Sequence, residues 1–290
     1  MDYLYHIIIM IGIYSILTLA ANIPTGLTNL LSLAQAAFYG IGAYLSAFVL
    51  LQYSLPVLPA LLLITLFTGA FSLLISFASI RLKGDYFVLA TMGFQLIAFA
   101  ILYNWTPVTR GPYGVTGIPS PKLMSTFEIS SNLQFAIFTL FLTALVALLF
   151  YTLSNSAYGR VLKAIRSDEL SVNISGRNVN GFKISAFFIS AAFSAIAGFI
   201  FASYVKYIDP TSFTLDESIF ILSALFIGGL GNVKGSIAGA AFIVLLPELL
   251  RFAGLPDSIA ANLRQIIYGL SLILVMRYYP KGLAGDIMLK

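Results

Sequence analysis

The chain has 290 residues, of which 59% are hydrophobic and only 9% are charged. Because about a quarter of the residues of a soluble domain are charged, this composition excludes an ordinary soluble domain. The net charge of +5 comes from 16 Lys and Arg residues that are not interleaved with aromatic residues, which excludes a nucleic-acid interface. With no cysteine and one histidine, His6, the chain offers neither disulfides nor a cysteine or histidine zinc site.

Charge-free stretches dominate the chain from its start: no Asp, Glu, Lys or Arg lies between Asp2 and Arg81. Hydrocarbon leaves only helices or closed barrels as spanning structures, and these runs are too continuous for alternating barrel strands. We therefore predict one all-α, polytopic membrane bundle over residues 1–290, with about eight to ten spans of roughly 20 residues. The predicted spans are 5–23, 29–52, 57–80, 86–103, 134–153, 185–205, 217–229, 236–252 and 263–279. The first is predicted to be a retained span, because no basic segment precedes it as in a signal peptide.

Polar side chains are rare inside the predicted spans. Asn29, Ser32 and Gln35 recur at three-residue spacing in the second span, which predicts that they share one helix face. Polar groups at membrane depth face the bundle interior or a wet cavity, so both helix–helix hydrogen bonding and contact with a solute fit the pattern. The candidate substrate-path residues are Asn29, Ser32, Gln35, Thr91 and Gln95.

Small residues recur at every fourth position in three places. Such ridges allow helix backbones to approach closely in a membrane, and they are compatible with plain packing or with helices that slide beside a substrate path. The ridges are Ser32, Ala36 and Gly40; Ser190, Ser194, Gly198 and Ala202; and Gly231, Gly235 and Gly239.

The last third of the chain contains two short apolar segments, 217–229 and 236–252, separated by several glycines. They predict either a hairpin of short spans or one broken helix. No Asp or Glu is expected in the middle of a span except Glu248, which is near a span end, so a proton relay would have almost no carboxylate to use.

Two loops between the spans are long. The loop 104–133 contains Pro107, Pro112, Pro119 and Pro121, which predicts an extracytoplasmic cap without long helices. The loop 154–184 is rich in basic residues, which predicts a cytoplasmic location. This orientation puts the C-terminus in the cytoplasm and the N-terminus outside. The basic residues that it leaves outside are Arg110, Lys122, Lys206, Arg251 and Arg264.

Within the loop 154–184, residues 159–172 have the pattern of a short amphipathic helix, and Gly176 is expected to end it. A helix of this kind can dock into a groove on a soluble partner, or it can rest on anionic lipid through its basic residues. The pattern leaves both interpretations open.

Residues 159–176 read G-R-V-L-K-A-I-R-S-D-E-L-x5-G, which resembles the coupling loop of branched-chain amino acid ABC transporter permeases of the LivM/LivH type. Four further segments agree in order and spacing, and the arrangement is closer to LivM. They are G-L-T-N-L-L-S-L-A-Q-A-A-F-Y-G-I-G-A-Y at 26–44, R-L-K-G-D-Y-F-V-L-A-T at 81–91, G-V-T-G-I-P at 114–119 and G-G-L-G-N-V-K-G-S-I-A-G-A at 228–240. The chain departs from the family pattern at Ser171, Val172 and Ser236, and at 110–114.

The resemblance implies a non-enzymatic import permease of a prokaryotic inner membrane, embedded in lipid, with no catalytic or metal-binding residue and no cofactor of its own. It implies four partners, namely a second, similar permease, two cytoplasmic ATPases that bind ATP and Mg²⁺, and an extracytoplasmic solute-binding protein. By this resemblance, the residues that couple to the ATPase are Gly159, Arg160, Ala164, Ile165, Arg166, Asp168, Glu169 and Gly176.

Other function classes fit the residues less well. The nearest string to a phosphate-binding loop runs from Gly231 to Ser236, but its lysine, Lys234, precedes the glycine that it should follow. ATP is therefore expected to be hydrolysed by another chain. The solute stays open between branched-chain amino acids and urea or short-chain amides. A secondary carrier that works without an ATPase is the rival hypothesis, and a membrane-embedded enzyme lacks a nucleophile with a base.

Overall fold

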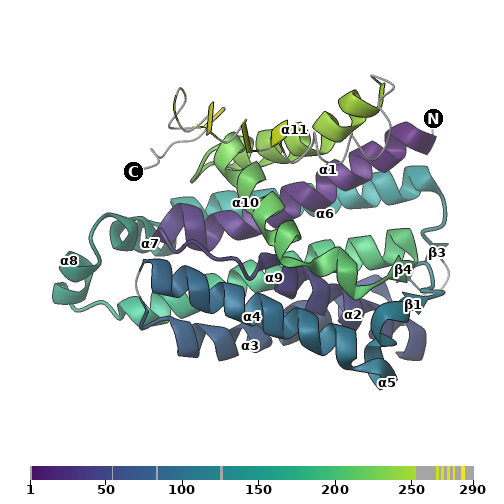
Figure 1. Ribbon diagram of the computed structural model, residues 1–290, viewed down its shortest axis with the longest axis horizontal. Coiled ribbons are helices and arrows are strands. Elements are labelled where there is room, and N and C mark those ends of the chain that lie inside the picture. Colours follow the sequence, from purple (N-terminus) through teal and green to yellow (C-terminus); the bar gives the residue numbers. More distant parts are fainter. Residues whose placement is uncertain are drawn as a thin grey trace.

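The computed structural model describes residues 2–53, 55–82, 84–124 and 127–252, and beyond these only 266–267, 269–270, 273–274, 277 and 282–284. Most of the described residues are helical (Figure 1). The long helices are α1 (Asp2–Ala21), α2 (Gln35–Tyr53), α3 (Val57–Ser79), α4 (Asp85–Asn104), α6 (Asn132–Asn155), α9 (Val179–Val205), α10 (Leu215–Gly228) and α11 (Val233–Phe252).

Shorter elements lie at the two ends of the bundle or between the long helices. The short helices are η1 (Asn22–Leu27, a π-helix), α5 (Thr106–Thr109), η2 (Gly111–Tyr113), α7 (Ala157–Ser167), α8 (Glu169–Ile174) and η3 (Pro210–Phe213). The strands are β1 (Val115–Thr116), β2 (Lys122–Met124), β3 (Phe127–Glu128) and β4 (Tyr207–Ile208). β1 pairs with β4 and β2 with β3, both antiparallel. The described part of the predicted cap 104–133 thus contains no long helix, as expected.

Six helices of the described residues are long and apolar enough to cross a membrane: Asp2–Leu27, which joins α1 to η1, and then α2, α3, α4, α6 and α9. These six spans were predicted from the sequence. The segments 217–229 and 236–252 correspond to α10 and α11, which pack against each other as a hairpin. Neither helix is among the six described helices that could cross a membrane, so the prediction that both segments are spans is not confirmed. The predicted span 263–279 lies in a stretch of which the structure describes only isolated residues.

The elements give the bundle two distinct ends. Figure 1 shows α7 and α8 at one end, called here the lever end, and β1, β3, β4 and α5 at the other, called here the strand end. Local capping sets several helix starts. Ser131 and Gln134 form a capping box at α6, and the side chains of Ser156 and Asn178 cap α7 and α9.

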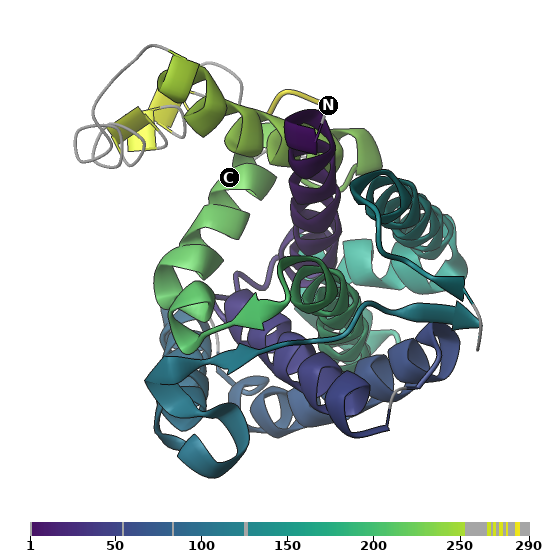
Figure 2. The same ribbon diagram turned by 90° about the vertical axis from the view of Figure 1, so that its right-hand side faces the viewer.

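The core of the bundle is formed by α1, α2 and α9, whereas α3, α4 and α6 expose much of their surface (Figure 2). The exposed surface of α3 is apolar, as a lipid-facing helix requires. Its exposed large side chains are Leu58, Leu62, Leu63, Leu66, Phe67, Leu74 and Phe77. Exposed Tyr53 and Trp105 lie near the strand end, and exposed Tyr86 and Tyr151 near the lever end. Aromatic residues at both ends of apolar helices are typical of the two membrane interfaces.

Glycines bring the central helices into backbone contact. A Cβ on Gly198 of α9 would lie 2.6 Å from the Ala43 nitrogen of α2, and one on Gly40 would lie 2.9 Å from the ring of Phe213. Between α10 and α11, a Cβ on Gly239 would lie 2.0 Å from the Ala224 oxygen, and one on Gly235 would lie 2.8 Å from the Gly228 oxygen. These distances are too short for any side chain.

The predicted ridge of Gly231, Gly235 and Gly239 is wrong for Gly231. That residue precedes α11 in the turn after α10, and its φ of +79° belongs to the left-handed region that favours glycine. The four-residue spacing of the three glycines suggested one helix, but Gly231 is not helical. Its backbone N–H donates to Asn22 Oδ1 at 2.9 Å and not to a carbonyl of a helix.

We expect Gly239→Ala to lower the free energy of unfolding by about 1–3 kcal/mol, because the added methyl group must displace the backbone of α10. Gly93→Ala is the matched control. Gly93 also lies inside a helix, but a Cβ there meets nothing within 4 Å. Thermal unfolding in detergent measures both, and equal melting temperatures for the two variants would contradict the close crossing of α10 and α11.

Candidate functional site

The second membrane segment is broken. The sequence predicted a span over 29–52, but residues 28–34 are not helical except at Thr28, and α2 begins only at Gln35. Before this stretch, α1 ends in the π-helix η1, and Asn29 has a φ of +58°, a value that Asn tolerates better than most residues. The prediction that Asn29, Ser32 and Gln35 share one helix face is therefore wrong, because a left-handed residue and an extended stretch separate them. Asn29 is exposed, whereas Ser32 and Gln35 are fully buried.

The N-terminus of α2 lies inside the protein, and side chains satisfy its backbone donors. Free N–H groups of a helix start need partners, and four side chains supply them: two from α4, one from α10 and one from the stretch just before α2. Leu33 N donates to Thr91 Oγ1 at 3.1 Å and Ala34 N donates to Ser32 Oγ at 3.2 Å. Ala36 N donates to Ser218 Oγ at 3.0 Å and Ala37 N donates to Gln95 Oε1 at 2.6 Å. Three of the predicted substrate-path residues, Ser32, Thr91 and Gln95, thus cap this helix.

Gln35 ties the same helix start to α9. Its Nε2 donates to Ser190 Oγ at 2.9 Å, and its Oε1 accepts from Ser194 Oγ at 2.9 Å. Ser190 Oγ in turn donates to the Ala20 oxygen of α1 at 2.8 Å. The small residues of the α9 ridge therefore do more than make room for a neighbouring backbone: two of them hydrogen-bond the side chain that opens α2.

A second half-length helix begins at the same depth. Gln95 lies midway along the 20 residues of α4, and its Nε2 donates to the Phe213 oxygen at 2.8 Å, just before α10 starts. α2 runs from this level to the strand end, and α10 runs from it to the lever end (Figure 1). Interrupted helices that meet near the middle of a bundle are typical of transporters, in which they surround the solute path. We call this meeting point the central break.

A carboxylate lies at this depth, contrary to the prediction that only Glu248 was available. Glu217 in the first turn of α10 accepts a hydrogen bond from the Tyr14 hydroxyl at 2.8 Å. Tyr14 lies at the middle of the 26-residue span Asp2–Leu27. The predicted span 217–229 put Glu217 at a span end, and this prediction was wrong. Residues 210–213 already lie inside the bundle, where the Phe213 oxygen accepts from Gln95, so α10 begins there. Glu248 itself accepts a hydrogen bond from the hydroxyl of Tyr3 at the start of α1.

At the lever end, the predicted helix 159–172 is two helices. α7 ends at Ser167, Asp168 is extended, and α8 begins at Glu169. The break arises because the Asp168 side chain caps the new helix: it accepts from Leu170 N at 2.9 Å and from the hydroxyl of Ser171. These hydrogen bonds, led by the one from the Ser171 hydroxyl, hold the pKa of Asp168 below its ordinary value. As predicted, the chain turns after α8 at Gly176, which has a φ of +79°. We call α7 and α8 together the lever.

Two residues assigned by resemblance to the ATPase contact also bind other parts of this chain. Arg166 Nη1 donates to the Thr25 oxygen and to the Gly26 oxygen, both at 2.9 Å, at the end of η1. Glu169 forms an ion pair with Lys183 of α9 at 2.7 Å, and the Lys183 side chain is only 4% exposed. Burial lowers the pKa of Arg166, but a guanidinium stays charged at neutral pH. The lever is therefore tied to α9 and to the segment before the central break.

The other residues assigned by resemblance to the ATPase contact differ in packing and exposure. A Cβ on Gly159 would lie 2.3 Å from the Leu153 oxygen, so this glycine permits the sharp bend from α6 to α7. Ile165 is buried with Val172 and Val179. Arg160 and Ala164 are exposed, as are the large apolar side chains of α8, Leu170 at 67% and Ile174 at 87%.

Sequence reasoning missed Lys183, Ser218 and Ile174 as parts of the site. Lys183 and Ser218 lack a local signal, because their partners are distant in the sequence. Ile174 had one, since it lies four residues after Leu170 and therefore on the same face of α8.

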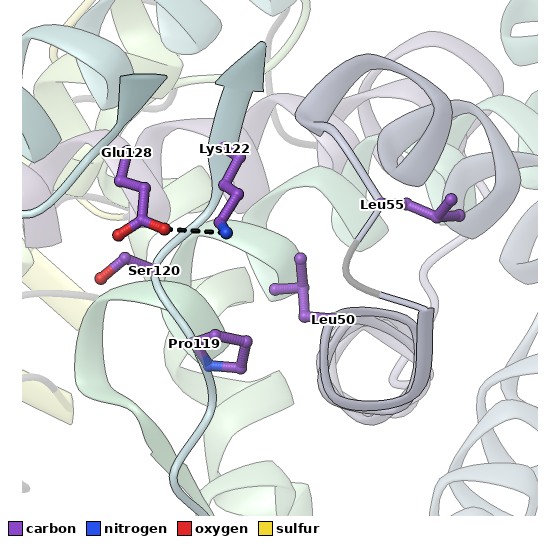
Figure 3. A pocket seen from close by; sticks show the side chains of 6 residues that line it. All are labelled: Leu50, Leu55, Pro119, Ser120, Lys122 and Glu128. Atoms are coloured by element: carbon purple, nitrogen blue, oxygen red, sulfur yellow. Dashed lines mark ion pairs between the residues drawn. The ribbon is translucent and has the colours of Figure 1, made fainter. Parts of the chain in front are cut away.

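A separate cavity of about 140 Å³ opens at the strand end (Figure 3). Its lining includes Lys122 and Glu128, which form an ion pair at 2.9 Å with both side chains largely exposed, so the pair adds little stability. Among the described residues, no three His, Cys, Asp or Glu side chains are grouped so that they could hold a metal ion.

The sequence is similar to a known protein family over most of its length. Residues 3–276 match the family profile described as branched-chain amino acid transport system, permease component. The chain is 32% identical over 296 residues to the high-affinity branched-chain amino acid transport system permease protein LivM of Salmonella typhimurium, an alignment that covers 94% of this chain and 68% of the relative. The corresponding protein of Escherichia coli is 33% identical over 293 residues, covering 93% and 67%. A probable LivM of Methanocaldococcus jannaschii is 30% identical over 222 residues, covering 72% and 62%. No solved structure matches the chain significantly.

We expect Gln95→Leu to lower the free energy of unfolding by about 2–4 kcal/mol, because it leaves the buried Ala37 N–H and Phe213 carbonyl without partners. The control is Thr65→Val in α3, whose hydroxyl bonds only carbonyls of its own helix, at 2.7 and 3.1 Å. Equilibrium unfolding in mixed micelles measures both. A loss in Gln95→Leu no larger than that in Thr65→Val would contradict the capping role.

The Glu169–Lys183 pair predicts an asymmetry between its two single variants. Glu169→Met leaves a buried ammonium unpaired and is expected to cost about 2 kcal/mol or more, whereas Lys183→Met leaves a carboxylate that water can reach and is expected to cost under about 1 kcal/mol. The double variant should recover most of the loss of Glu169→Met, because two methionines pack where the ions met. The same unfolding assay applies, and the reverse order of the two single variants would rule out the buried pair.

Proposed function

The chain belongs to the branched-chain amino acid transport permease family, and from this membership we propose that it is the membrane-spanning permease subunit of an ATP-binding-cassette importer. The observation that carries the proposal is the family match over residues 3–276. Two features of the structure support it: half-length helices that meet at the central break, and a lever at one end whose outer face carries exposed apolar side chains.

We propose branched-chain or similar hydrophobic amino acids as the solute, because the three relatives carry this substrate in their names. Urea and short-chain amides are the alternative. Uptake competition separates the two classes: unlabelled leucine, isoleucine and valine should suppress uptake of labelled leucine, and urea should not. Suppression by urea at equal concentration would favour the alternative.

The assembly that we propose contains a second, similar permease, two ATPases that bind ATP and Mg²⁺ on the cytoplasmic side, and a solute-binding protein outside. The lever end would face the cytoplasm and the strand end the outside of a prokaryotic inner membrane. The concentration of basic residues in the loop 154–184 supports this orientation. The chain itself would hold no cofactor and catalyse no covalent step.

Exposed apolar groups on the lever give it a docking face. Leu170 and Ile174 lie one turn apart on α8, so both side chains project from the same side of a short helix. Large apolar side chains exposed next to charged ones are typical of a helix that docks into a groove of a partner. In the proposed cycle, closure of the two ATPases moves α8, and the movement passes to α9 through the Glu169–Lys183 ion pair.

The central break would form the gate along the solute path. Its hydrogen bonds link α2, α4, α9 and α10 through side chains that can exchange partners, so α2 and α10 can separate without unfolding either helix. Exchange of such bonds for water or solute is feasible only where a wet path reaches them. We propose that Ser32, Gln35, Thr91 and Gln95 reach the solute only when this gate opens, and that exposed Asn29 lies at its mouth on the lever side.

A secondary carrier that works without ATP is the second candidate, and Glu217 at mid-depth is the observation that favours it. The test uses liposomes containing the purified complex. ATP-dependent uptake that persists with a protonophore supports the importer, whereas uptake by this chain alone, driven by a pH gradient, would overturn it. Copurification of nucleotide-binding subunits with the tagged chain is the first step of the same experiment.

For the docking face, we expect the double variant Leu170→Glu/Ile174→Glu to lower both the amount of copurified ATPase and the rate of uptake at least tenfold. The charges would have to be buried at the interface, whereas both positions are exposed in the isolated chain, so membrane insertion should not change. Leu170→Met/Ile174→Val keeps the face apolar and should copurify like the unmodified chain. Normal copurification of the Glu variant would show that α8 does not form the contact with the ATPase.

A further inference from the structure

The guanidinium of Arg166 holds the end of the π-helix that leads into the central break. Its Nη1 donates to the carbonyl oxygens of Thr25 and Gly26, each at 2.9 Å. Carbonyl groups at the end of a helix lack partners within the helix and carry the negative end of the helix dipole. A cation that bonds two of them is therefore a strong and directional contact. It joins the lever to a membrane segment far away in sequence.

The segment that Arg166 holds is built to change shape. π-Helices are rare and occur mostly at functional sites, and η1 contains both Pro24 and Gly26. Gly26 is also closely packed, since a Cβ there would lie 1.7 Å from Asn22 Oδ1. Two residues after the end of η1, Asn29 has a left-handed φ of +58°. Residues 29–34 are not helical, and they connect η1 to the start of α2 at Gln35.

The same π-helix is connected to the α10–α11 hairpin. Asn22 Oδ1 accepts from Gly231 N at 2.9 Å, and Asn22 Nδ2 donates to Ser236 Oγ at 2.8 Å. A shift of η1 is therefore transmitted in two directions, along residues 28–34 to the start of α2 and across Asn22 to the hairpin that contains α10. Both half-length helices of the central break are connected to η1, and Arg166 of the lever hydrogen-bonds to η1.

We propose that Arg166 is the positioning residue through which the lever controls the central break, and that loss of its bonds to the Thr25 and Gly26 carbonyls accompanies opening of the gate. The inference rests on the proposed importer function and goes beyond it, because the family resemblance assigned Arg166 only to the contact with the ATPase. In this assignment Arg166 acts inside its own chain, and Leu170 and Ile174 make the contact with the partner.

The test compares Arg166→Gln, Arg166→Lys and Arg177→Gln in the assembled complex in liposomes. Arg177 is an exposed arginine of the same loop and serves as the charge-matched control. Arg166→Gln is expected to keep ATP hydrolysis within about threefold of the unmodified complex, but to lower the uptake per ATP hydrolysed at least tenfold. Arg166→Lys, which retains a cation able to reach the carbonyls, should recover most of the uptake, and Arg177→Gln should behave as unmodified.

A direct readout of the gate uses the absence of cysteine from the chain. Ser32→Cys places a single thiol at a fully buried position in the segment 28–34. With Arg166 present, its reaction rate with a maleimide should differ at least fivefold between nucleotide-free complex and complex trapped with ATP and vanadate. With Arg166→Gln this difference should disappear, and with Arg177→Gln it should remain. A purely structural role would change the amount of complex but not this nucleotide dependence.

Two results would overturn the proposal. One is coupled uptake and nucleotide-dependent labelling in Arg166→Gln. The other is failure of both Arg166 variants to assemble, which would make the residue a static contact. Failure of the importer function itself would appear elsewhere, as absence of ATP-dependent uptake in the unmodified complex, so the two failures are distinguishable.

Discussion

A helix that starts inside a membrane protein leaves backbone donors where water cannot satisfy them, and the rest of this structure depends on how the start of α2 meets that constraint. An unpaired backbone group costs several kcal/mol in hydrocarbon. The chain meets it with Ser32 of the preceding stretch, Thr91 and Gln95 of α4, and Ser218 of α10. Because three of these caps come from α4 and α10, the satisfied start of α2 requires both helices beside it. The central break is therefore a point at which hydrogen bonds join several helices of the bundle.

The same caps make the break suitable for a gate. Side-chain bonds to a helix start can be exchanged one by one, whereas the backbone bonds inside α2 and α10 cannot be broken without unfolding them. The glycine contacts around the break have the opposite property. Gly198 and Gly239 pack directly on backbone, so the α9–α2 and α10–α11 crossings should move as units. Rigid pairs joined by exchangeable polar contacts are what a movement between discrete states requires.

The lever connects to this centre by two kinds of contact. The Glu169–Lys183 ion pair binds α8 to a continuous spanning helix, and Arg166 binds α7 to the end of an interrupted one. A continuous helix transmits tilt over its whole length, whereas an interrupted one allows its two parts to move separately. In the proposed importer the lever would receive the movement of the ATPases, and the contacts of the lever explain how a displacement at one end of the bundle could reach the middle.

The sequence by itself determined the membrane class, six spans with ends within six residues of those observed, the lever loop and the family, because all of these depend on apolar run length, charge distribution and local motifs. It also singled out Gln35, Thr91 and Gln95, since polar residues are conspicuous in apolar helices. Only the tertiary structure decided that residues 29–34 are not helical, that Glu217 lies at mid-depth and that Arg166 faces inward. An apolar run predicts burial but not continuity of the helix, and the partners of these residues are mostly more than 100 positions away, so no local pattern could reveal them.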